Sequence, residues 1–153
     1  IGTTNVLRTG KKSLAAITLL FDILKGYISI IIAFKYFNEL IYLSALICFT
    51  GHIFPVWLKF KGGKGVATYL GIILGISFIL GIIFCISWLL IAIIFRYSSL
   101  SSILASMIIF IYSIFLNNEI QSYFLFIIFL IIIFTHKENI IRLKNSKESK
   151  IKL

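Results

Sequence analysis

The chain has 153 residues, of which 60% are hydrophobic and only 13% are charged, and its mean hydropathy is +1.08. A soluble domain of this length has no use for so much apolar surface, so the composition indicates an integral membrane protein. The formal net charge of +10 does not indicate nucleic-acid binding, because the basic residues lie at the ends of apolar segments. Basic residues in such positions set membrane topology and meet anionic headgroups.

Apolar blocks long enough for helices follow one another along the chain, and they predict an all-α, polytopic helical bundle. We expect one membrane domain over residues 1–153, with a cytoplasmic loop at 1–12 and a basic cytoplasmic tail at 136–153. The blocks cover residues 13–36, 39–58, 66–95, 99–116 and 121–135.

The third block, residues 66–95, is longer than the roughly 20 residues that one span needs. Basic residues near the start of the chain and in the tail place both on the cytoplasmic side. A single crossing by residues 66–95 would put the tail outside. We therefore predict two shorter helices, broken near residues 75–81, and about six helices in all.

A basic, glycine-rich turn, Lys-Gly-Gly-Lys-Gly, separates the second block from the third at residues 61–65. Gly62, Gly63 and Gly65 let backbone N–H groups approach an anion, and Lys64 supplies a point charge for a phosphate. The start of the next helix adds partial positive charge. The turn is thus a candidate anion cradle, although a flexible basic connection between two spans explains it equally well. Its spacing is not that of a P-loop.

Other polar groups lie in or beside the apolar blocks. Asp22 and Lys25 share one helix face and predict an ion pair, which is either structural or orients the site loop. His136 and Asn139 form a His-x-x-Asn pair that could hold a hydroxyl or phosphate oxygen, or simply solvate a helix end. The serines at 98–102 either cap a helix or donate hydroxyls to an anion.

No Ser-His-Asp order is present in the sequence, and Asp22 is the only aspartate. An enzyme built on this chain would therefore lack a conventional nucleophile–base relay. Orientation of the substrates and neutralisation of charge would have to carry its catalysis.

Three polar segments taken together, residues 2–8, 51–68 and 136–143, resemble the bacterial acyl-phosphate:glycerol-3-phosphate acyltransferases, the PlsY family. Residues 22–26 and 99–102 also match the pattern, so the resemblance covers essentially the whole chain. It implies a multi-pass protein of the bacterial inner membrane whose active site faces the cytoplasm. The reaction would move an acyl group from acyl phosphate to the sn-1 hydroxyl of glycerol 3-phosphate, giving lysophosphatidic acid and phosphate.

The resemblance also implies roles for individual residues. Arg8 and Lys64 would bind the phosphates, His136 and Asn139 would orient glycerol 3-phosphate, and Ser101 would supply a hydroxyl. These five are the candidate catalytic residues, and further substrate-binding candidates are Thr4, Asn5, Gly62, Gly63, Gly65 and Ser99. The expected partners are glycerol 3-phosphate, acyl phosphate and membrane lipid. No metal, cofactor, nucleic acid or stable protein partner is expected.

The sequence departs from the family pattern at its start. The pattern places Ser-Gly-Asn just before Ile1 and a transmembrane helix before that, and Thr3 is usually alanine. We therefore keep a truncated, inactive remnant as one alternative. A small-anion transporter is another, although it should carry paired polar residues on several helices, and the blocks offer mainly Asp22 and Lys25.

Overall fold

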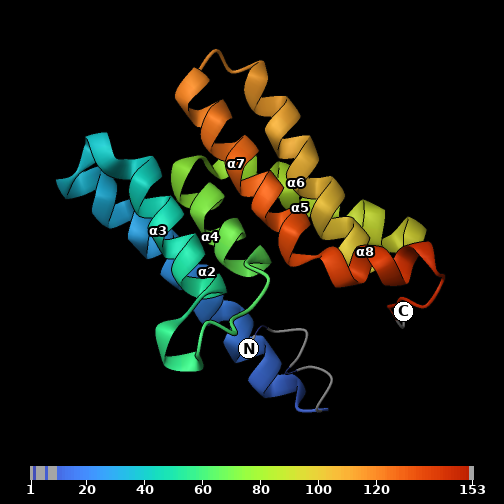
Figure 1. Cartoon of the computed structure of the whole chain (residues 1–153). Helices are drawn as coiled ribbons and strands as arrows, with labels where there is room; N and C mark the ends of the chain where they lie inside the picture. The colour runs from blue at the N-terminus through green and yellow to red at the C-terminus, as the bar shows by residue number, and fades with distance from the viewer. Residues whose placement is uncertain (1, 3–5, 7–9, 152–153) are drawn as a thin grey trace. The chain divides into compact units, whose positions relative to one another are not determined.

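The computed structural model describes residues 2, 6 and 10–151, and these residues form helices and no strands (Figure 1). The all-α prediction is confirmed. The chain divides into two compact units, Ile1–Gly81 and Ile82–Leu153. The α-helices are α2 (Lys12–Tyr36), α3 (Ile41–Ile53), α4 (Val66–Ile76), α5 (Phe78–Phe95), α6 (Ser98–Ile114), α7 (Glu119–Thr135) and α8 (Lys137–Lys144), with short 3₁₀ turns η1 (Asn38–Leu40) and η2 (Val56–Leu58) on either side of α3.

In the first unit, α2 packs closely against both α3 and α4. A side chain on Gly26 would collide with the backbone of Thr68 in α4, and a side chain on Gly71 would collide with the backbone of Ile23 in α2. Small residues at such contacts let two helix backbones approach, which is how helices associate where lipid removes the hydrophobic driving force. These glycines let α4 lie close against α2, and α4 begins directly after the glycine–lysine turn.

Large apolar side chains point away from the helix contacts. On α2, Phe21 is 64% exposed and Leu20 is 55% exposed, whereas Ala15 and Ala33 are buried. Among the described residues, α2, the segment Asn38–Leu58 and α5 are long and apolar enough to cross a membrane. The bent pair α7–α8 could form a fourth span. An apolar outer surface on helices of this length suits lipid, as the sequence predicted.

The predicted break in residues 66–95 lies at Ser77. This residue has extended backbone angles (φ −155°, ψ 122°) and separates α4 from α5. A Cβ on Gly81 would lie 3.4 Å from the Cα of Leu74, whereas residues seven apart in one straight helix are about 10 Å apart. The chain therefore folds back on itself after α4, which confirms the prediction of two helices.

In the second unit, α6 and α7 pack along each other. Phe110 of α6 contacts Phe126 and Phe129 of α7, with ring centroids 5.0 and 6.3 Å apart. Trp88 of α5 donates a hydrogen bond to Ser102 Oγ (3.0 Å) at the start of α6. Helices α7 and α8 bend by 60° relative to each other, and His136 is the residue between them. Helix α8 contacts α6 as well as α7.

The α2–α4 contact yields a stability prediction. Gly71→Ala forces a methyl group into the backbone of α2, and overpacking of this kind costs about 1–3 kcal/mol of unfolding free energy. The measurement is denaturation in detergent micelles. Gly51→Ala is the matched control, because a Cβ there meets no atom within 4 Å. Equal stability of the two variants would contradict the proposed close contact.

Candidate functional site

The glycine–lysine turn lies against the end of α3. The N–H of Gly62 donates to the carbonyl of Ile53 (3.0 Å), and the N–H of Gly63 donates to the carbonyl of His52 (3.3 Å). A side chain on Gly62 would meet those same carbonyls, and one on Gly63 would meet the His52 ring. These two glycines are thus required for close packing, and their N–H groups are engaged by the last turn of α3.

The turn ends at the N-terminus of α4, where the candidate anion-binding features come together. Gly65 is the N-cap residue in the left-handed region (φ 83°), and a side chain there would meet the Phe49 ring. Lys64 precedes it and is half-buried. Thr68, in the first turn, is fully buried, and its hydroxyl has no hydrogen-bond partner within the described part of the chain. A helix N-terminus beside a lysine favours a bound anion.

The beginning of the chain reaches the same place. The Cα of Gly2 lies 3.4 Å from the position that a Cβ on Gly63 would take. Gly2 therefore lies against a turn that is about 60 residues further along the sequence. The candidate residues Thr4, Asn5 and Arg8 lie outside the described residues, so their predicted roles stay predictions.

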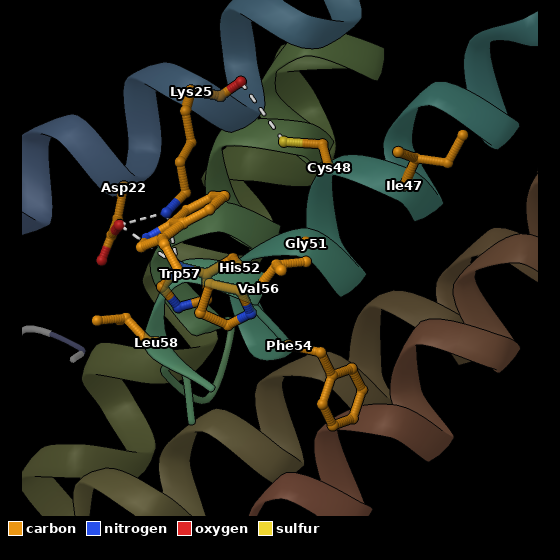
Figure 2. Close-up of a pocket in the computed structure, with 11 residues that line it drawn as sticks. Asp22, Lys25, Ile47, Cys48, Gly51, His52, Phe54, Val56, Trp57 and Leu58 are labelled. Carbon is orange, nitrogen blue, oxygen red and sulfur yellow. Dashed lines mark hydrogen bonds and ion pairs between the residues drawn. The ribbon is translucent and has the colours of Figure 1, made fainter. Parts of the chain in front are cut away.

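Asp22 and Lys25 form the predicted ion pair, and His52 joins it (Figure 2). Lys25 Nζ lies 2.5 Å from Asp22 Oδ1 and 2.6 Å from His52 Nδ1. His52 in turn contacts Gly63 through its ring and Gly63 N–H through its carbonyl. The pair in α2 is thereby connected to the glycine–lysine turn through one side chain. The sequence left two roles open for this pair, a structural one and one that orients the site loop. The contacts with His52 favour the orienting role.

A cavity of about 440 Å³ opens beside the ion pair. Figure 2 shows the charged side chains of Asp22 and Lys25 together with His52, and the apolar side chains of Val56, Trp57 and Leu58 from η2. The cavity thus combines a polar wall with an apolar one, the combination that an amphipathic molecule requires.

His136 and Asn139 are both buried in the second unit, 2% and 3% exposed. His136 Nδ1 lies 2.8 Å from the carbonyl oxygen of Ile132. A carbonyl can only accept, so Nδ1 carries the proton and, in the neutral ring, Nε2 carries the lone pair. The bond to Ile132 therefore fixes the tautomer of the neutral His136 ring, and Nε2 is the nitrogen that can accept a hydrogen bond.

The two candidate serines differ in what their hydroxyls do. Ser101 is fully buried, and its hydroxyl donates to the carbonyl of Tyr97, one turn back (2.8 Å). Ser99 is buried too, but its hydroxyl donates to Glu148 Oε1 (2.8 Å). Ser99 and Asn139 are brought together by this carboxylate, whereas Ser101 bonds within its own helix.

Glu148 is the residue that sequence reasoning missed. Its side chain is 5% exposed and accepts hydrogen bonds from Asn139 (2.5 Å) and Arg142 (2.7 Å) as well as from Ser99. Burial by itself would raise the pKa of Glu148, but the bonds from Asn139, Arg142 and Ser99 outweigh burial and lower that pKa. The available signal was a lone acidic residue in an otherwise basic segment after Glu138.

The described residues contain no group of three or more His, Cys, Asp or Glu side chains placed to hold a metal ion. At the start of α4, the side chain of Lys64 is a cation and the backbone N–H groups of the first turn are donors. They suit the binding of anionic oxygen atoms. Fold and site thus define a polytopic helical membrane protein with a candidate anion-binding site.

Comparisons with known proteins agree on one family. The family model for glycerol-3-phosphate acyltransferase matches residues 1–146. The chain is 47% identical to the glycerol-3-phosphate acyltransferase of Pelagibacter ubique (strain HTCC1062), over 100% of this chain and 80% of that protein. It is 52% identical to that of Francisella tularensis subsp. holarctica (strain OSU18), over 98% and 74%. The chain belongs to the glycerol-3-phosphate acyltransferase family.

Solved structures of PlsY (YgiH), an integral membrane glycerol 3-phosphate acyltransferase, have the same fold. The glycerol 3-phosphate form superposes with a TM-score of 0.94 at 34% identity, covering 99% of this chain and 78% of that one. The lysophosphatidic acid form gives 0.92 at 35% identity, covering 97% and 78%. The predicted resemblance to the PlsY family is confirmed.

The buried carboxylate predicts a pH dependence of stability. Because the folded-state pKa of Glu148 is lowered, its contribution is complete above the ordinary glutamate value of 4.5 and is lost as pH falls through the lowered pKa. Glu148→Gln should therefore cost about 1–3 kcal/mol near neutral pH, where charged hydrogen bonds are lost. Thermal denaturation of both proteins across pH should show a constant difference at neutral pH that shrinks in acid. A difference that grows in acid would contradict this assignment.

Proposed function

We propose that this chain transfers a fatty acyl group from acyl phosphate to the sn-1 hydroxyl of glycerol 3-phosphate, an early step of phospholipid synthesis. The glycerol oxygen attacks the acyl carbonyl carbon, and the bond from that carbon to the phosphate oxygen breaks. Lysophosphatidic acid and inorganic phosphate are formed, and the hydroxyl proton leaves with the phosphate. This reaction needs no covalent acyl-enzyme, which suits a chain without a nucleophile–base relay.

The observation that carries the proposal is the meeting of Gly2, the glycine–lysine turn and the start of α4 in the first unit. In this proposal Lys64 and Arg8 bind phosphate groups, and the N-terminus of α4 adds partial positive charge. Gly62, Gly63 and Gly65 shape the turn, and Thr4 and Asn5 contact the acyl-phosphate end. Charge that develops on the leaving phosphate is stabilised by groups already fixed in place.

In the second unit, His136 and Asn139 orient glycerol 3-phosphate. His136 Nε2 accepts a hydrogen bond from the glycerol part of the substrate, because Nδ1 already donates to Ile132, and the proton of the attacking hydroxyl goes to the phosphate. Ser101 supports the start of α6 through its bond to Tyr97. Ser99 donates a hydrogen bond to Glu148, the same carboxylate that accepts from Asn139. Holding the hydroxyl in line with the acyl carbon converts a bimolecular encounter into an oriented one.

The protein is proposed to lie in the bacterial cytoplasmic membrane as one membrane domain, with lipid around it and the site facing the cytoplasm. This orientation is supported by the basic residues of the turn, the start of the chain and the tail, since basic residues favour the cytoplasmic side. Both substrates are phosphorylated, and glycerol 3-phosphate is water-soluble. A cytoplasmic opening gives it direct access.

Lys64→Ala should lower the rate of acyl transfer by about 10²–10³-fold, because a charge aimed at the transferring group is removed. The assay uses the complete protein that carries this chain, with acyl phosphate and glycerol 3-phosphate in lipid vesicles. Lys59→Ala is the matched control, since Lys59 is an exposed lysine of the same connection, and it should keep the wild-type rate.

An unchanged rate in Lys64→Ala would refute the assigned phosphate site. Absence of transfer by the complete wild-type protein, together with phosphate flux across vesicles that lack an acyl donor, would favour the transporter alternative instead. Absence of both activities would favour an inactive remnant.

A further inference from the structure

A single carboxylate connects two elements that carry candidate substrate-binding residues. Glu148 Oε1 accepts from Ser99 Oγ of α6 (2.8 Å) and from Asn139 Nδ2 of α8 (2.5 Å). Glu148 Oε2 accepts from Arg142 Nε (2.7 Å). All four side chains belong to the second unit. The two residues assigned to substrate binding thus share one oxygen atom of a third residue.

The chemistry of the carboxylate decides how the Asn139 amide is oriented. An ionised carboxylate only accepts hydrogen bonds, so it must face the NH₂ group of the amide. The carbonyl oxygen of Asn139 is then held on the opposite side of its planar amide group. Without Glu148, either end of the amide could turn toward α6. A substrate hydroxyl can donate only to the carbonyl oxygen of Asn139. It therefore requires the orientation in which the NH₂ group faces Glu148.

The segment that carries Glu148 is itself held at both ends. We call residues 145–151 the C-terminal strap. At its start, the N–H of Lys147 donates to the carbonyl of Arg142 (2.7 Å). At its end, the N–H of Ile151 donates to the carbonyl of Arg96 (2.7 Å), and the Arg96 guanidinium donates to the carbonyl of Ile151 (3.1 and 3.2 Å). Glu148 is therefore placed by backbone bonds on either side of it.

The groups around the Glu148 side chain satisfy an ionised carboxylate that is removed from water. The Glu148 side chain is 5% exposed, and a buried charge requires partners that satisfy it. Arg142 supplies the cation, and Ser99 and Asn139 supply neutral donors. These two donors connect the carboxylate to the candidate substrate-binding residues of α6 and α8. Glu138, by comparison, lies 3.9 Å from Arg142 with a side chain that is 77% exposed.

We propose that Glu148 is a positioning residue for glycerol 3-phosphate, acting through the amide of Asn139 and the hydroxyl of Ser99. The inference rests on the function proposed above, because it assumes that Asn139 contacts this substrate. Glu148 itself touches no reacting atom. It sets the direction in which the Asn139 carbonyl oxygen meets the glycerol part, so its loss should weaken glycerol 3-phosphate binding more than acyl-phosphate binding.

The test compares Glu148→Gln with Glu138→Gln in the complete protein. Both variants remove one negative charge near Arg142, but only the first changes the contacts of Asn139. Glu148→Gln should raise the KM for glycerol 3-phosphate at least tenfold while the KM for acyl phosphate stays within twofold. Glu138→Gln should leave both values unchanged, and Glu148→Asp, which keeps the carboxylate, should fall between wild type and Glu148→Gln.

A double-variant cycle separates positioning from a general loss of structure. If Glu148 acts through Asn139, adding Glu148→Gln to Asn139→Ala should raise the KM for glycerol 3-phosphate much less than adding it to the wild type, and the part that remains is the route through Ser99. Melting temperatures are measured in parallel, and the assays are run well below them. Should Glu148→Gln not fold, Glu148→Asp carries the test, with the same substrate-selective rise in KM expected.

Three results would overturn the inference. They are an unchanged KM for glycerol 3-phosphate in the folded variant, equal increases for both substrates, and fully additive effects in the cycle. Failure of the proposed function looks different, because the wild-type protein would then show no acyl transfer or Asn139→Ala would have no effect.

Discussion

A carboxylate removed from water is stable only beside a cation and hydrogen-bond donors, and one such group lies at the centre of the polar cluster in each compact unit. In the first unit, Asp22 pairs with Lys25, and Lys25 contacts His52. In the second, Glu148 pairs with Arg142 and also accepts from Ser99 and Asn139. The requirement to satisfy a buried charge thus determines where the neighbouring polar side chains lie. In the second unit, two of these neighbours, Ser99 and Asn139, are candidates for binding substrate.

The apolar surroundings make this constraint strict. Helices that face lipid cannot use water to satisfy polar groups, so each polar group must find its partner inside the protein. Close helix contacts at Gly26 and Gly71 bring α2 and α4 together, and the turn before α4 is positioned as a result. Polar groups are concentrated where helices end, at the turn before α4, at the start of α6 and at the bend between α7 and α8. Helix ends also offer the unpaired backbone donors that bind anions.

The sequence predicts the helices well because hydropathy and charge are local properties of the chain. The break at Ser77 follows from glycine content and charge parity, and the ion pair of Asp22 with Lys25 follows from helical spacing.

Contacts between distant residues were not predictable in this way. Nothing in the local pattern around Glu148 indicates that Ser99, 49 residues earlier, is its partner. The engagement of Gly62 and Gly63 by the end of α3 depends equally on the tertiary fold. Membership of the glycerol-3-phosphate acyltransferase family was predicted from several separated motifs taken together, and the family model and the relatives confirm it.

The central proposal is that the segment from His136 to Arg142 in the second unit binds glycerol 3-phosphate and that the glycine–lysine turn in the first unit binds a phosphate group. Hydrogen–deuterium exchange of the complete protein, with and without glycerol 3-phosphate, tests it most directly because it requires no turnover. The account predicts that added glycerol 3-phosphate slows exchange in residues 61–68 and in residues 136–142, and that inorganic sulfate at equal concentration protects the second segment less. Slower exchange elsewhere in the protein, with neither segment affected, would contradict the account.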